Sequence, residues 1–228
     1  MNKALLSILL IAPVFASDEG MPEHSKRIHE SATVLSEIMG ASDRSIPEDL
    51  LGKAQCVGVV PNLKRAGFII GGKYGKGVLT CRVNSPTGWS APSTIRIEGG
   101  SVGLQIGAGE TDVIFIVMNQ TGVEKLMKDK FTIGGDASAM AGPVGRSAEA
   151  RTDAMMRAEI LSYSRSRGVF AGVSLEGATL RPDNDDNAKI YKHTVTQREL
   201  IEGKVAPPRI AKPLHEELNR WAPVKKTS

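Results

Sequence analysis

The stretch GFIIGGKYGKG, residues 67–77, decides how the middle of the chain is interpreted. Up to Lys73 it fits the G-x-x-x-x-G-K pattern of a phosphate-binding loop, but Tyr74 stands where that loop needs Ser or Thr to hold magnesium. The Phe-Ile-Ile run favours a strand, and the later glycines would interrupt the helix that has to follow such a loop. The stretch therefore predicts a strand, a tight turn at 74–76 and the start of a second strand, and no nucleotide site.

Short runs of β-branched and apolar residues recur on both sides of this stretch. Turn residues separate them by a few positions, which predicts hairpins and antiparallel pairing. Glycines inside several runs indicate bulges or close backbone contacts, as in a curved sheet. We therefore expect an α+β single domain with a curved, mainly antiparallel β-sheet or barrel-like core flanked by short helices. The expected strands are residues 56–61, 67–73, 77–83, 93–99, 101–107, 112–118, 158–165 and 169–180.

Helices are expected before and after these strands. Ile28, Ala32, Leu35 and Ile38 form one apolar stripe, so residues 25–40 are expected to form an amphipathic helix. Such a helix either docks on the core or lies on a membrane. Capping boxes are expected to join Ser45 with Glu48, Thr121 with Glu124 and Thr196 with Glu199, and further helices are expected near 183–192 and 214–221.

The first residues predict the compartment. A short positive start, MNK, precedes the apolar run at 4–14, and small residues then stand at the −3 and −1 positions before Ser17. This pattern is typical of a secretory signal peptide, residues 1–16, and the alternative is a buried N-terminal helix. No cysteine follows the cleavage point, so a lipoprotein anchor is not expected. We therefore expect a soluble periplasmic or secreted protein.

Two cysteines, Cys56 and Cys81, remain in the exported chain. An oxidising compartment permits one disulfide between them, provided that their Cα atoms lie within about 7 Å. The alternative is two small buried thiols in strands. The sequence leaves both possibilities open.

Charge is uneven along the chain. The segment from Leu50 to Ile97 holds seven basic residues and no acidic residue. If these cations share one face, that face attracts anionic surfaces such as lipid headgroups. The alternative is a solvated face whose charges are balanced by acids from elsewhere in the fold.

The motifs of common enzymes and cofactor sites are absent. The four histidines lie outside the expected sheet, and no His, Cys and carboxylate cluster has metal-ligand spacing. With 4% aromatic residues, the chain has few platforms for stacking nucleic-acid bases. We expect no catalytic activity, no cofactor, no metal, no nucleotide and no nucleic acid. Three arginines, Arg146, Arg165 and Arg167, are candidates for anion binding or for pairing with Glu149, Glu159 or Glu176.

Several long blocks occur in the order seen in one family. They include GVVP, GFIIGGKYGKGVL, GWSAPSTIRIEGGSVGLQIG, TDVIFIVMN, KFTIGGDASAMAGPVGR and AEILSYSRSRGVFAGVSLEGATLRPD. In these blocks the chain resembles the SYLF domain family of lipid-binding proteins, from Arg27 to Lys192. The resemblance divides the chain into the signal peptide, a SYLF-like domain at 17–192 and a basic, proline-containing C-terminal extension at 193–228.

The resemblance implies binding rather than catalysis. Eukaryotic SYLF proteins bind phosphoinositides and other anionic lipids, and fungal members also bind actin. This chain carries an export signal and no SH3 domain, so it looks like the stand-alone bacterial type, for which actin binding is not expected. The expected partner is an anionic phospholipid or membrane surface. The alternative is a structural or interaction module that binds an envelope protein or polymer.

Basic residues at strand ends and turns are the candidate lipid-binding residues, because side chains and glycine-exposed amides can meet a phosphate together there. Two more basic residues lie on the amphipathic helix and are second-line candidates. The first group is Lys64, Arg65, Lys73 and Lys76, and the second is Lys26 and Arg27.

Overall fold

The computed structural model describes residues 20–41, 45–67, 70–102, 107–145, 158–166 and 168–223. The expected signal peptide, residues 1–16, lies outside these ranges, as do Arg146, Glu149 and Arg167. Within the described ranges, no helix is long and apolar enough to cross a membrane.

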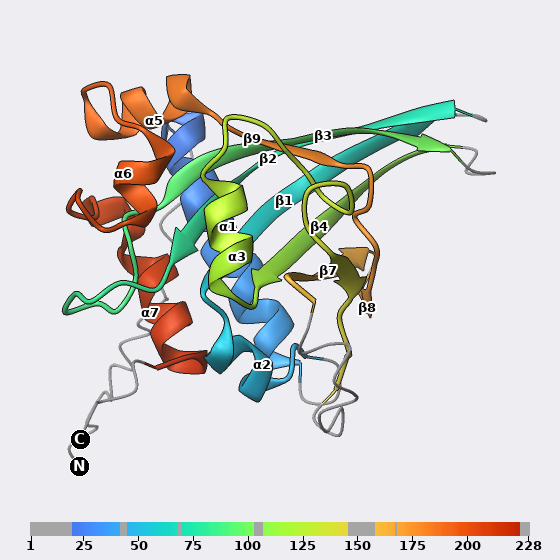
Figure 1. Ribbon diagram of the computed structural model, residues 1–228, viewed down its shortest axis with the longest axis horizontal. Coiled ribbons are helices and arrows are strands. Elements are labelled where there is room, and N and C mark those ends of the chain that lie inside the picture. Colours follow the sequence, from blue (N-terminus) through green and yellow to red (C-terminus); the bar gives the residue numbers. More distant parts are fainter. Residues whose placement is uncertain are drawn as a thin grey trace, which may run out of the picture.

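One strongly curled, open sheet of nine strands dominates the described part of the chain (Figure 1). Its order is β5-β9-β3-β2-β1-β4-β7-β6, with β8 paired to β7, and every pairing is antiparallel except that of β6 with β7. The expected α+β class with a curved, mainly antiparallel sheet is confirmed. The strands are β1 (Cys56–Gly67), β2 (Ile70–Cys81), β3 (Ser93–Val102), β4 (Gly107–Val117), β5 (Phe131–Thr132), β6 (Ala139–Ala141), β7 (Ile160–Ser166), β8 (Val169–Gly172) and β9 (Thr179–Pro182).

The turn expected at residues 74–76 is wrong, because β2 runs through it without a break. Tyr74 pairs with Glu98 of β3, and the pairing continues in unbroken register from Ile70 to Leu79. The connection between β1 and β2 lies instead between Gly67 and Ile70. The two runs expected as separate strands on either side of residues 74–76 therefore form one long strand, β2.

The glycines of β2 serve close packing against β1 rather than a turn. A Cβ atom at Gly77 would lie 2.2 Å from the carbonyl oxygen of Val59, and one at Gly75 would lie 2.7 Å from Leu63 Cδ1. At this point the pairing of β1 with β2 shifts between Val59 and Lys64, and Asn62 adopts a left-handed φ of 51°. Glycine opposite this bulge lets the two backbones approach.

Seven short helices flank the sheet in the described residues. The helix expected at 25–40 and the capping box of Thr196 with Glu199 are confirmed. The box at Ser45 is wrong because Pro47 is the N-cap, without a side-chain bond, and at Thr121 the cap is Asn119, whose side chain accepts from Gly122 N. The helices are α1 (Glu23–Gly40), α2 (Glu48–Lys53), α3 (Gln120–Leu126), α5 (Asn184–Tyr191), α6 (Gln197–Ile201), the 3₁₀ helix η1 (Arg209–Ala211) and α7 (Lys212–Trp221).

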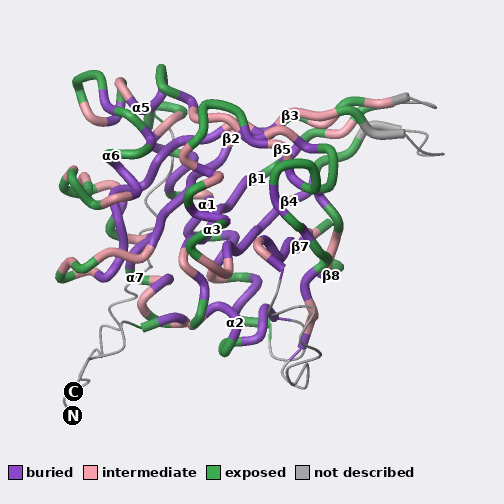
Figure 2. The backbone as a smooth tube through the Cα atoms, viewed as in Figure 1, coloured by how far each residue is buried: buried purple, intermediate pink, exposed green. Residues whose placement is uncertain are grey.

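Two hydrophobic clusters lie on opposite faces of the sheet, and both are buried in the centre of the molecule (Figure 2). We call the face covered by α1, α2 and α7 the outer face; there Leu35 and Leu218 pack with Val57. We call the other the inner face; there Leu126 and Phe131 pack with strand residues from both ends of the curled sheet. Because α7 belongs to the outer cluster, residues 193–223 are part of the folded body.

A disulfide joins Cys56 to Cys81, which is the first of the two alternatives left open by the sequence. The two cysteines are direct partners at one end of the β1–β2 pair, and both are buried on the inner face. The bridge therefore fixes the register of the two central strands at the end away from their hairpin.

Reducing this bridge is expected to lower the free energy of unfolding by about 3 kcal/mol, because it closes a loop between cysteines 25 residues apart. Urea unfolding with and without reductant measures the effect. The Cys56→Ala/Cys81→Ala variant is the control, since reductant should not change its midpoint. An equal midpoint for the wild-type protein in both conditions would contradict the prediction.

Candidate functional site

The ends of the four longest strands project beyond the rest of the protein (Figure 1). The neighbouring strands stop early: β9 pairs with β3 only as far as Glu98, and β7 pairs with β4 only as far as Asp112. Beyond these points only β1 to β4 remain paired with one another. We call this projection, together with the pairs at its base, the ribbon; it comprises residues 63–67, 70–74, 98–102 and 107–111.

Strand alternation divides the charged residues of the ribbon between its two faces. Arg65 pairs directly with Lys73, so both side chains lie on the inner face. Lys64 pairs with Tyr74, so both lie on the outer face. Across the four strands, the inner row is Gly99, Lys73, Arg65 and Gly109, and the outer row is Glu98, Tyr74, Lys64 and Glu110.

The inner pair of cations lacks a carboxylate partner in the part of the chain that the structure describes. Neither Arg65 nor Lys73 has an acidic oxygen within 4.0 Å there, and Arg65 Nε is buried without a hydrogen-bond partner. Burial lowers the pKa of Lys73, and the positive charge of Arg65 lowers it further. The pair is therefore a concentrated positive charge that is partly removed from water.

The outer face is closer to neutral. Lys64 Nζ lies 3.9 Å from Glu110 Oε1, and the two side chains are 74% and 58% exposed. Arg96 and Arg181 both lie within about 4 Å of Glu98, at 3.9 Å and 4.0 Å. For the acid-free segment, acids from elsewhere balance Lys64, Lys76 and Arg96. Lys53, Arg82 and the adjacent pair of Arg65 and Lys73 have no acidic partner among the described residues, and within the ribbon this leaves the inner pair unbalanced.

Lys76 is not a surface cation, although the sequence places it in the candidate set. Its Nζ lies 2.7 Å from Asp183 and 3.0 Å from Asp186, two acids that α5 brings to the outer face. Burial opposes the charge of Lys76, but the hydrogen bonds to these acids raise its pKa overall. Lys76 therefore has a structural role and leaves the candidate set.

Arg27 also leaves the set, because it is buried. Its side chain is 7% exposed, and its Nη1 donates to Asp186 Oδ2 at 2.8 Å while Nη2 lies 3.2 Å from Glu23. The bond to Asp186 holds α1 against α5. Lys26, on the same helix, remains at the surface and lies 3.7 Å from Glu30, so it keeps its second-line status.

Arg165 pairs with acids other than those expected from the sequence. Its guanidinium donates to Asp112 Oδ2 at 2.7 Å and also to Glu37 of α1, rather than to Glu159 or Glu176. Glu159 instead accepts from Lys125 at 2.6 Å. Arg165 therefore ties β4 and β7 to α1 on the outer face and is not a candidate anion site.

The glycines that flank the cationic pair were missed at the sequence level. Gly109 has no atom within 4 Å of an added Cβ, so the inner face is open beside Arg65. At Gly99 an added Cβ would lie 2.9 Å from Lys73 Cε, so the lysine stem occupies the place of a side chain there. The glycine spacing was visible in the sequence, but only the strand register places these residues in one row with Arg65 and Lys73.

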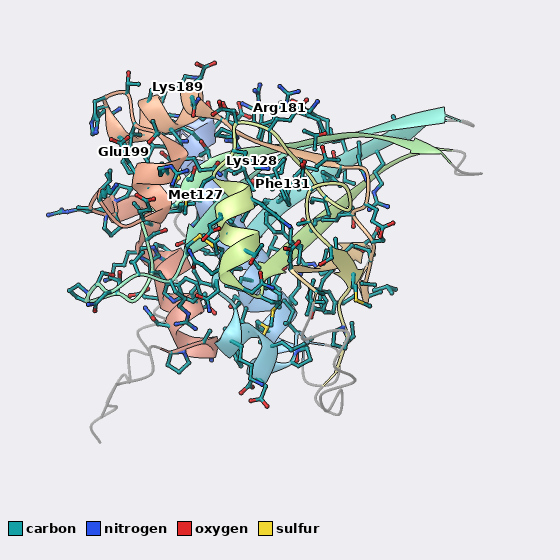
Figure 3. The ribbon with its side chains drawn as sticks, in the orientation of Figure 1. Met127, Lys128, Phe131, Arg181, Lys189 and Glu199 are labelled. Carbon is teal, nitrogen blue, oxygen red and sulfur yellow. A yellow bond between two sulfur atoms is a disulfide. The ribbon has the colours of Figure 1, made fainter. Side chains whose placement is uncertain are left out.

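A pocket of about 280 Å³ lies elsewhere, between the end of α3, the end of β9 and the segment that enters α6. Figure 3 shows two of its residues, Met127 and Lys128, just past α3. Gln197 lines it and donates to Leu126 O at 2.6 Å. Within the described ranges, no group of three or more His, Cys, Asp or Glu side chains is placed to hold a metal ion. The ribbon therefore remains the strongest candidate site.

Fold and site together define a single-domain α+β protein with a curled half-barrel sheet and a cationic β-ribbon. The chain belongs to the Ysc84 family, described as Las17-binding protein actin regulator, whose model matches residues 98–221, more than half of the chain. This is the SYLF family, so the resemblance seen in the sequence blocks is confirmed.

Known proteins are similar over most of the chain. LAS seventeen-binding protein 3 of Saccharomyces cerevisiae is 35% identical over 213 residues, which cover 92% of this chain and 46% of that protein. SH3 domain-containing YSC84-like protein 1 of Mus musculus is 35% identical over 181 residues, which cover 78% of this chain and 52% of that protein. The chain thus spans about half the length of the curated relatives it matches.

Proposed function

We propose that this protein is an exported lipid-binding protein, and that its ribbon docks on anionic, phosphoinositide-like headgroups at a membrane surface. The observation that carries the proposal is the inner pair of Arg65 and Lys73, two adjacent cations without an acidic partner among the described residues. They stand on a projection that can reach a flat surface before the body does. Lys64 adds charge on the same projection, and membership of the SYLF family supports a lipid or protein partner.

Charge on the ribbon is expected to control membrane binding. Each Lys or Arg near an anionic surface contributes about 1 kcal/mol, so replacing Lys64, Arg65 and Lys73 together by Gln should weaken binding roughly 100-fold. The measurement is co-sedimentation of the purified protein with vesicles of phosphatidylcholine that contain 30%, or no, phosphatidylglycerol. High salt should reduce the binding of the wild-type protein.

The control removes the same charge from the body: Lys53, Lys128 and Lys212, all exposed, become Gln. This variant should lose far less binding than the ribbon variant. Equal binding to neutral and anionic vesicles, or no binding at all, would refute the proposal. Equal loss in both variants would show that net charge, and not the ribbon, determines binding.

The alternative is a structural or interaction module that binds an envelope protein or polymer. The family description, Las17-binding protein actin regulator, names a protein partner and favours this second candidate. A ribbon variant that loses vesicle binding but still retains a specific envelope protein in a pull-down would support the alternative.

A further inference from the structure

The pairing of Arg65 with Lys73 is unfavourable for the sheet by itself. Residues directly opposite in an antiparallel pair have Cβ atoms about 4.5–5.5 Å apart, and like charges at that distance destabilise the pairing. Elsewhere in the described residues Arg27 and Lys76 both bind Asp186, and Arg82, which has no carboxylate partner among them, lies 4.1 Å from the centre of the Trp89 ring rather than opposite another cation. An anion bound between Arg65 and Lys73 would remove the repulsion and would also give Arg65 Nε an acceptor.

The inner face has space for such an anion on one side of the pair. Gly109 is exposed, and nothing lies within 4 Å of the position of an added Cβ, next to Arg65 in the row. On the other side the Lys73 stem lies over Gly99, where an added Cβ would also lie 3.1 Å from Ala178 Cα and 3.2 Å from the carbonyl oxygen of Gly177. The open position beside Arg65 suits the planar guanidinium, which binds two oxygens of one phosphate or carboxylate.

The charge of the pair selects the class of anion. Two cations face one position, while Lys64 points to the opposite face and has Glu110 beside it. A phosphodiester carries one negative charge, whereas a phosphomonoester carries about −1.5 to −2 at pH 7, with a second pKa of about 6. A single phosphomonoester group therefore neutralises the pair, and a phosphodiester leaves it half neutralised.

We propose that Arg65 and Lys73 form a site for one phosphomonoester dianion, presented by a membrane lipid such as phosphatidic acid. The proposal rests on the proposed function, because it names the headgroup class that the ribbon prefers. It also makes the two faces of the ribbon unequal: the inner face selects the headgroup, and the outer face adds general attraction.

The test compares vesicles of phosphatidic acid with vesicles of phosphatidylglycerol, adjusted to equal surface potential. Binding to phosphatidic acid is expected to be about tenfold tighter at pH 7.5, and the preference should shrink toward pH 5 as the monoester takes up its second proton. Arg65→Gln and Lys73→Gln should each remove the preference and its pH dependence. Lys64→Gln, the adjacent cation on the opposite face, should lower binding to both vesicles and keep the preference.

A second pair of variants tests the site without changing charge. Gly109→Val places a side chain in the open position beside Arg65 and should remove the preference. Gly72→Val is the matched control, because Gly72 lies on the outer face and also has nothing within 4 Å of an added Cβ. Circular dichroism of both variants shows whether the sheet is retained.

The outcomes separate this proposal from the proposed function. Equal binding to the two vesicles, or a preference that persists in Arg65→Gln and in Gly109→Val, overturns the phosphomonoester site and leaves anionic membrane docking standing. Absence of binding to both vesicles and to glycerol 3-phosphate overturns both proposals. Binding of glycerol 3-phosphate in solution without any vesicle binding overturns the lipid as the source of the phosphate.

Discussion

Replacing Asp186 with alanine is expected to lower the free energy of unfolding by about 3–5 kcal/mol, the range found when one partner of a buried ion pair is removed. Asp186 Oδ2 accepts from Arg27 at 2.8 Å and from Lys76 at 3.0 Å, and Oδ1 accepts from Lys189 at 3.2 Å. Without the carboxylate, Arg27 stays buried, and its remaining acidic partner among the described residues is the exposed Glu23. The loss is thus dominated by an uncompensated buried charge, and urea unfolding measures it.

The difference in free energy of unfolding between the wild-type protein and Asp186→Ala depends on pH, because it depends on the charge and hence on the pKa of Asp186. Burial alone would raise that pKa, but hydrogen bonds from Arg27, Lys76 and Lys189 outweigh burial and hold it well below its ordinary value of about 3.9. A depressed pKa contributes stability that is fully present above the unfolded-state pKa and is lost as the pH falls toward the folded-state pKa. The stability gap between wild type and Asp186→Ala should therefore be constant above about pH 5 and should narrow below pH 4.

Asp185 provides the matched control. It is the neighbouring acid in the first turn of α5, but it is exposed, so Asp185→Ala removes only an interaction with the helix dipole of about 0.3–1 kcal/mol. Similar losses for the two variants would contradict the role assigned to the buried ion pairs. Asp186→Asn, which keeps the shape and removes the charge, should resemble Asp186→Ala.

The fold class could be predicted because strand signals and glycines are local properties of the sequence. The runs around Cys56, Val78 and Phe115 do form paired strands. The turn at Tyr74 could not be rejected, because glycine favours turns and also permits close packing. Gly75 and Gly77 take the second role only because β1 has a bulge opposite them, and that bulge depends on pairing between distant segments.

The candidate site was predicted in part, and its failures share one cause. Lys76 and Arg27 look exposed in the sequence because their acidic partner, Asp186, is 110 and 159 residues away along the chain. Lys73 and Lys76 are three residues apart in one strand, so they point to opposite faces and have different roles. Their spacing in the sequence suggested one cationic patch. The strand register instead places Lys73 beside Arg65 on the inner face, and it places Lys76 on the outer face, where it pairs with Asp183 and Asp186.

Replacing Phe115 with alanine is expected to lower the free energy of unfolding by about 3–5 kcal/mol, as is usual for a large buried aromatic side chain. Phe115 has 0% relative exposure and lies in the inner cluster, where it pairs directly with Gly58 across β1 and β4. Its ring covers this glycine, since a Cβ atom at Gly58 would lie 2.1 Å from Phe115 Cζ. Thermal and urea unfolding measure the loss.

A double-mutant cycle tests whether the ring and the glycine act as a pair. Gly58→Ala alone forces the Phe115 ring to move and should cost about 1–3 kcal/mol by overpacking. In the Phe115→Ala background the same methyl group enters the vacated space, so Gly58→Ala should be nearly neutral or stabilising there. The two changes should therefore be non-additive by at least about 1 kcal/mol, as expected for residues in contact. Additive losses would mean that Gly58 is required for its backbone conformation and not to accommodate the ring that joins β1 to β4 below the ribbon.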